Sequence, residues 1–223
     1  MTPRTRLFAG ILAGPIFVTA FLIEGAFRAG YDPMRHPVSS LSLGEFGWTQ
    51  VVNFLLTGAL LIVFATGLRD KPAQRREIAV LVFFMGIGLI GAGIFPTDPI
   101  GGYPPGTPPE LAYTPTGIAH DAFSALFFLG LPVACLIAAA IFLRQKRWGA
   151  MAYSLLTVPI FLLTFGLAGA GFQQYPHWVP HAGLMQRISI VTGFAWLGWL
   201  AWDQRRSTSS SSPSSGSTRG SSG

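Results

Sequence analysis

Long runs of apolar residues alternate with short polar segments along this chain. Six runs each hold roughly 18 or more residues with almost no charge, which is enough for an α-helix to cross a bilayer. These runs cover residues 7–27, 50–68, 78–95, 118–143, 149–171 and 184–202. A helix on the surface of a soluble protein keeps a polar face, and these runs have none. The pattern predicts an all-α fold, a polytopic bundle of six transmembrane helices formed by residues 1–206.

Basic residues gather in alternate connections between the runs. Most of them precede the first run or follow the second, fourth and sixth runs: Arg4, Arg6, Arg69, Lys71, Arg75, Arg76, Arg144, Lys146, Arg147, Arg205, Arg206 and Arg219. The other connections hold Arg35, with Arg28 and Arg187 near their edges. Cytoplasmic connections of membrane proteins are enriched in Lys and Arg. We therefore expect both termini to be cytoplasmic, and the longer connections, 29–48, 96–116 and 172–183, to lie on the other side.

The composition agrees with a membrane protein. Charged residues make up 11% of the 223 residues and the mean hydropathy is +0.48, whereas a soluble domain carries about 25% charge. The net charge of +6 follows the topology pattern, so we expect membrane lipids as partners and no nucleic acid. The lone Cys135 forms no intrachain disulfide. The Ser/Gly-rich residues 207–223 predict a disordered cytoplasmic tail.

Glycines cluster in several of the apolar runs. The third run contains Gly86, Gly88, Gly91 and Gly93, and three more close the fifth run: Gly166, Gly169 and Gly171. Small residues allow helix backbones to approach closely within lipid. These glycine-rich faces indicate either packing inside one bundle or contact between two copies in a homodimer.

Two polar side chains stand out at the ends of apolar runs on the non-cytoplasmic side. His120 lies in GIAHD, residues 117–121, about one turn and a half inside a helix that Thr114 and Pro115 are expected to start. Ser124 lies one turn further on the same face. Arg187 lies in GLMQR, residues 183–187, and only about 15 apolar residues follow it, fewer than a span needs. A guanidinium buried in this way needs a partner.

Asp98, in the FPTDP segment at residues 95–99, is the partner that we expect for Arg187. Glu24 and Glu45 are alternatives, and the guanidinium extending to lipid headgroups is another. We expect Asp98, His120 and Arg187 to form one polar pocket. There, His120 would act as a proton donor or ligand, Asp98 as a base or ion-pair partner, and Arg187 as a clamp for a headgroup or carboxylate.

No cofactor is required by this arrangement, but a zinc site is an alternative. His177 and His181 have an H-x3-H spacing, which on a helix places both imidazoles on one face. His120 would be the third ligand, with Asp98 as fourth ligand or base. Pro180 falls between the two histidines, so that segment is expected to be helical only from about residue 180. Histidines at helix interfaces without a metal are the other interpretation.

Four short motifs, YDPMRHPVSSL at 31–41, FPTDP, GIAHD and GLMQR, resemble the bacterial membrane family called domain of unknown function 998. The resemblance covers roughly residues 7–204 and implies a six-helix domain of the plasma membrane with an extracytoplasmic polar cluster and no established activity. The motif positions are Asp32, Pro37, Ser39, Asp98, His120, Gln186 and Arg187. The Ser, Asp and His set is more distantly similar to the alkaline ceramidase and progestin-receptor superfamily of membrane hydrolases. The departures are six spans instead of seven and the proline within H-x3-H.

Three functions remain open from the sequence. The first is a pocket that binds or processes a lipid or amphiphile. The second is a non-catalytic scaffold or accessory subunit in which the same residues fix helix ends. A transporter is disfavoured, because charged-solute carriers use ionisable residues at mid-membrane depth, where this chain has only neutral polar ones: Asn53, Thr57, Ser154, Thr157, Thr164 and Thr192. The sequence does not decide whether the protein is an enzyme.

Overall fold

Six long helices make up most of the chain. The computed structural model describes residues 2–69, 76–108, 110–111 and 113–209. The helices are α1 (Pro3–Phe27), α2 (Gly47–Arg69), α3 (Arg76–Ile94), α4 (Pro115–Arg144), α5 (Trp148–Phe172) and α6 (Ala182–Ser209). Two short 3-10 helices, η1 (Val38–Ser42) and η3 (Val179–His181), lie in the connections. The described residues contain no strand, so the all-α prediction is confirmed.

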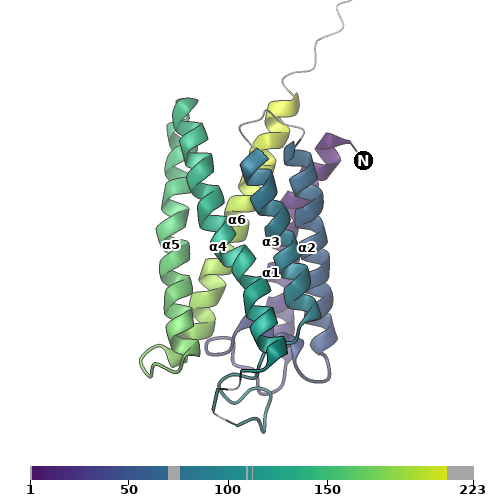
Figure 1. The fold of residues 1–223 in the computed structure, drawn as a ribbon, viewed down its shortest axis with the longest axis vertical. Coiled ribbons are helices and arrows are strands. Elements are labelled where there is room, and N and C mark those ends of the chain that lie inside the picture. The colour runs from purple at the N-terminus through teal and green to yellow at the C-terminus, as the bar shows by residue number, and fades with distance from the viewer. Residues whose placement is uncertain (1, 70–75, 109, 112, 210–223) are drawn as a thin grey trace, which may run out of the picture.

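The helices form a closed ring in chain order. Each helix packs against the next one, and α6 packs against α1. Neighbouring helices run antiparallel, so the two ends of the bundle differ (Figure 1). One end carries the N-terminus, the end of α6 and the short α4–α5 connection, and we call it the terminal end. The opposite end carries the three longer connections, and we call it the loop end.

Five of the helices, α1 to α5, are long and apolar enough to cross a membrane. The exception is α6, which begins AGLMQR and ends with the polar segment DQRRSTS. The chain is therefore a membrane-like helical protein, while the sixth span and the side on which the termini lie remain predictions.

The helix boundaries follow local sequence signals. Thr114 caps α4, because its hydroxyl accepts the backbone N–H of Gly117 at 3.1 Å, and Pro115 occupies the first helical position. A proline is tolerated there since its missing N–H has no partner within the helix. The expected start of this helix is thus confirmed.

The end of the chain departs from the sequence expectation in one respect. Helix α6 continues to Ser209, so the first residues of the predicted tail are helical. The rest of that tail, residues 210–223, lies outside the described residues, as do Lys71 and Arg75 of the α2–α3 connection.

Glycines on α2 and α3 bring these helices into backbone contact. A Cβ added at Gly58 would lie 2.6 Å from the carbonyl oxygen of Gly86, and a Cβ added at Gly86 would lie 2.7 Å from that of Gly58. Gly88 and Gly91 make similar room for Phe123 of α4. The α3 glycines therefore serve packing inside the chain, and contact between two copies remains a prediction.

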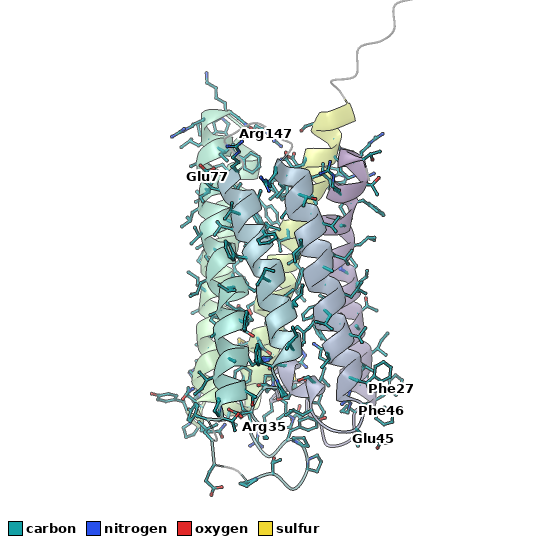
Figure 2. The ribbon with its side chains drawn as sticks, turned by 45° about the vertical axis from the view of Figure 1, so that its right-hand side comes forward. Phe27, Arg35, Glu45, Phe46, Glu77 and Arg147 are labelled. Carbon is teal, nitrogen blue, oxygen red and sulfur yellow. The ribbon has the colours of Figure 1, made fainter. Side chains whose placement is uncertain are left out.

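An ion pair closes the terminal end of the bundle. Arg147, at the start of α5, donates to both carboxylate oxygens of Asp203 on α6, at 3.1 Å from Nη1 to Oδ2. The guanidinium also lies over the Phe142 ring, 4.7 Å from its centroid. Figure 2 shows Arg147 at this end, opposite Arg35 and Glu45. No pairing of Asp203 was predicted from the sequence.

Candidate functional site

Polar side chains from distant parts of the chain converge at the loop end. The connection between α1 and α2, the connection between α3 and α4, and the first turns of α4 and α6 meet there (Figure 1). They form two adjoining structures. The first is a cluster around Arg187, and the second is a cavity lined in part by Asp98 and His120.

Arg187 is buried at the start of α6, with 8% of its surface exposed. Its Nη1 donates to the carbonyl oxygens of His36 at 3.1 Å and Gly183 at 3.0 Å, and its Nη2 donates to the hydroxyl of Tyr31. The expected burial is confirmed, but the expected contact with Asp98 is wrong. One loop carbonyl, one carbonyl of α6 and a phenol bond the guanidinium in place of a carboxylate, and its buried Nε has no hydrogen-bond partner among the described residues.

Tyr31 links Arg187 to the α1–α2 connection. Its hydroxyl donates to the carbonyl oxygen of Pro37 at 3.0 Å while accepting from Arg187. Burial raises the pKa of Tyr31 to about 12, although the neighbouring Arg187 charge opposes this. The hydroxyl therefore keeps its proton, and its donor role, at neutral pH.

His36 joins two connections through its ring. Its Nδ1 accepts the backbone N–H of Asp32 at 2.8 Å, and its Nε2 lies 3.3 Å from the carbonyl oxygen of Gly101. An imidazole that accepts at one nitrogen and donates at the other is neutral. Burial lowers the pKa of His36, and the charges of Arg35 and Arg187 lower it further. No role for this histidine was predicted from the sequence.

Gln186 fastens the first turn of α6 to η1. Its Oε1 accepts the backbone N–H of Val38 at 2.8 Å, and the side chain is 9% exposed. In the same turn of α6, the backbone N–H of Leu184 donates to the carbonyl oxygen of Met34 at 3.0 Å. Gly183 has no room for a side chain, because a Cβ would lie 2.6 Å from the carbonyl oxygens of both His36 and Pro33.

Asp98 binds the residue that caps the start of α4. Its Oδ2 accepts the backbone N–H of Thr114 at 2.9 Å and its Oδ1 accepts the Thr114 hydroxyl at 2.6 Å. A carboxylate is favoured at a helix N-terminus by the partial positive charge there. The site also requires Gly117, since a Cβ on that residue would overlap the Asp98 carboxylate. Both carboxylate oxygens of Asp98 thus bond Thr114 rather than Arg187.

His120 contacts the end of α3. Its Nδ1 lies 2.9 Å from the carbonyl oxygen of Ala92 and 3.0 Å from that of Phe95, and the residue is 3% exposed. Because both partners are acceptors, Nδ1 carries the hydrogen. Terminal carbonyls of a helix lack partners within the helix, so this bond explains the histidine in an apolar run. Among the described residues nothing bonds its Nε2.

A cavity of about 380 Å³ lies at this end, and all six helices contribute residues to its lining. Most of its wall is aromatic or aliphatic, with Phe17, Phe54, Phe127, Phe128, Phe165 and Phe194 among the lining residues. Its polar lining includes Asp98, His120, Asp121, Ser124 and Gln186. The expected shared face of His120 and Ser124 is thus observed. Arg187 is not among the lining residues.

The two remaining histidines lie elsewhere. His177 and His181 are exposed around η3, and the ring of His177 packs edge-on against Trp178. The helix at this segment begins only after Pro180, as expected. No group of three or more His, Cys, Asp or Glu side chains suited to a metal ion occurs in the part of the chain that the structure describes. The structure therefore does not bring these two histidines together with His120.

Fold and site together define a helical protein with membrane-length helices and a partly polar cavity at one end. The chain belongs to the family described as "Protein of unknown function (DUF998)", whose model matches residues 11–203. Neither the curated proteins nor the solved structures contain a match to this chain. The motif residues that carry the resemblance are divided between the cavity and the cluster around Arg187. Ser39, Asp98 and His120 line the cavity, whereas Arg187 lies in the neighbouring cluster.

Proposed function

We propose that this protein spans the bacterial plasma membrane six times and binds a lipid or amphiphile in the cavity at its loop end. This end would face away from the cytoplasm, because basic residues are concentrated at the terminal end. Among the described residues the terminal end carries Arg4, Arg6, Arg69, Arg76, Arg144, Lys146, Arg147, Arg205 and Arg206, whereas the loop end carries Arg28, Arg35 and Arg187.

The cavity lining is the observation that supports ligand binding. Pockets for small molecules combine a mainly apolar wall with a few polar groups, and this one places phenylalanines beside Asp98, Asp121 and His120. Exposed Tyr113, Asp121 and Gln173 belong to the same lining, so the cavity reaches the molecular surface. An amphiphile fits this division, with its apolar body against the rings and its head beside the polar groups.

Gly169 offers a direct test. It lines the cavity and a Cβ added there would meet nothing within 4 Å, so Gly169→Leu would fill the space without a clash in the bundle. Gly166, one turn away on α5, also has nothing within 4 Å and is not part of the lining. Gly166→Leu is therefore the matched control.

The measurement is binding of a fluorescent alkyl-chain probe to the purified protein in nanodiscs. We expect Gly169→Leu to weaken binding strongly, and Gly166→Leu to bind like the unmodified protein. Equal binding by all three proteins would exclude the cavity as the ligand site.

A non-catalytic scaffold is a second candidate, and a specific observation favours it. Asp98, His120 and Arg187 each bond to a helix end or to a loop carbonyl. In this alternative they only hold the loop end together. Substitutions at these three positions would then change the stability of the protein, while Gly169→Leu would leave its function in the cell unchanged.

A further inference from the structure

The charges around the cavity indicate which kind of head group it accepts. We infer that the ligand is an amphiphile with a protonated amine head, held by Asp121 and the Nε2 atom of His120. This inference rests on the proposed function and specifies its ligand. Anionic lipids and fatty acids would be excluded by the same groups.

The charged lining of the cavity has one sign. Asp98 and Asp121 both line it, and no Lys or Arg does so among the described residues. The guanidinium of nearby Arg187 donates instead to the carbonyl oxygens of His36 and Gly183 and to the hydroxyl of Tyr31. Two carboxylates without a cationic neighbour in the cavity favour a positively charged ligand and disfavour a carboxylate or phosphate.

The two carboxylates differ in their availability. Asp98 already accepts two hydrogen bonds from Thr114. Asp121 is exposed at the edge of the cavity and accepts no hydrogen bond from the described residues. Asp98, His120 and Asp121 all line the same cavity. Asp121 is therefore the carboxylate that can pair with an incoming cation.

His120 supplies an independent indication of a ligand. It is 97% buried, its exposed fraction being 3%, and it lines the cavity. Its Nδ1 is turned to the α3 carbonyls, which leaves Nε2 as a hydrogen-bond acceptor beside the cavity. A protonated primary amine has N–H groups to donate to this nitrogen, whereas a quaternary ammonium has none.

The aromatic wall suits both parts of such a ligand. Phe128 and Phe165 stack with their centroids 4.1 Å apart and line the cavity, and Tyr113 and Phe172 lie in the same lining. Ring faces attract cations and also bury an apolar chain. The body of the ligand would lie against these rings.

The test uses the full chain in phosphatidylcholine nanodiscs, with empty nanodiscs subtracted. Radiolabelled dodecylammonium is displaced by unlabelled dodecylammonium, dodecyltrimethylammonium or dodecanoate. We expect dodecylammonium to compete best, and Asp121→Asn to weaken its binding about tenfold through loss of a charge-assisted hydrogen bond. Asp121→Glu, which keeps the charge, should retain most of the affinity. Glu45→Gln, an exposed acid at the same end and outside the cavity, should change nothing.

The outcomes separate the inference from the proposed function. Equal competition by dodecanoate, together with loss of all binding in Gly169→Leu, would overturn the amine head and leave the cavity intact as a ligand site. Equal competition by dodecyltrimethylammonium would overturn the role of His120. If Gly169→Leu leaves all binding unchanged, both the inference and the proposed function fall.

Discussion

At the scale of the residue, one guanidinium links helix α6 to the α1–α2 connection. Arg187 of α6 bonds to the carbonyl oxygen of His36, to the hydroxyl of Tyr31 and to its own helix at Gly183. A buried charge is stabilised only when such partners surround it. Removal of the guanidinium would therefore leave several acceptors without their hydrogen-bond donor at once.

Arg187→Gln is expected to lower the free energy of unfolding by about 3 kcal/mol, since hydrogen bonds to a buried charged group are lost. The measurement is reversible unfolding in mixed detergent micelles. Arg35→Gln is the control, because Arg35 is exposed in the α1–α2 connection that Arg187 contacts. Equal losses in both variants would contradict the account of the cluster.

His36 predicts how stability depends on pH. Burial lowers its pKa from the ordinary value of 6.5, so the unfolded chain takes up a proton at a higher pH than the folded one. The stabilisation is complete above pH 6.5 and is lost as the pH falls from there through the folded pKa. His36→Gln, which cannot titrate, should remove this part of the pH dependence of the unfolding midpoint. The exposed His181 provides the control: His181→Gln should keep it.

Side-chain identity explains which of these contacts the sequence could predict. The need of Arg187 for a buried partner was predictable, because the apolar run after it is too short. Its actual partners were not, since two of them are backbone carbonyls, which every residue carries. The same holds for His120, which contacts carbonyls of Ala92 and Phe95 rather than a recognisable side chain.

At the scale of the element, the sequence predicted the helices well. Each apolar run lies in one of the six helices, apart from residue 95, which follows the end of α3. Thr114 with Pro115 predicted the start of α4. The pairing of Arg147 with Asp203 was missed, because it depends on how the start of α5 meets the end of α6, and no local pattern contains that information.

The α2–α3 contact gives a prediction at this scale. Gly86→Ala should cost about 2 kcal/mol of unfolding free energy, because the new methyl group would press on the Gly58 backbone and separate the helices. Gly166→Ala, where a Cβ has space, should be neutral or slightly stabilising, since alanine favours helix over glycine. Thermal unfolding of both variants in detergent compares them. A neutral Gly86→Ala would show that the helices do not pack this closely.

At the scale of the whole molecule, the two ends of the bundle differ in charge and in connection length. The terminal end carries most of the basic residues, and the loop end carries the cavity. This asymmetry predicts the orientation in the membrane. Cysteines introduced by Glu45→Cys at the loop end and Gln145→Cys at the terminal end report on it, since both positions are exposed.

A membrane-impermeant maleimide should label Glu45→Cys in intact cells and Gln145→Cys only after the membrane is opened. The native Cys135 is buried and should stay unlabelled, as the unmodified protein will show. The reverse labelling order would place the loop end in the cytoplasm and contradict the proposed topology.

Native mass spectrometry of protein released from its own membrane can show directly whether the cavity at the loop end holds an amphiphile. We expect a bound amphiphile on the unmodified protein and on Gly166→Leu, and none on Gly169→Leu. The same bound species on all three proteins, or none on any of them, would contradict the proposed function.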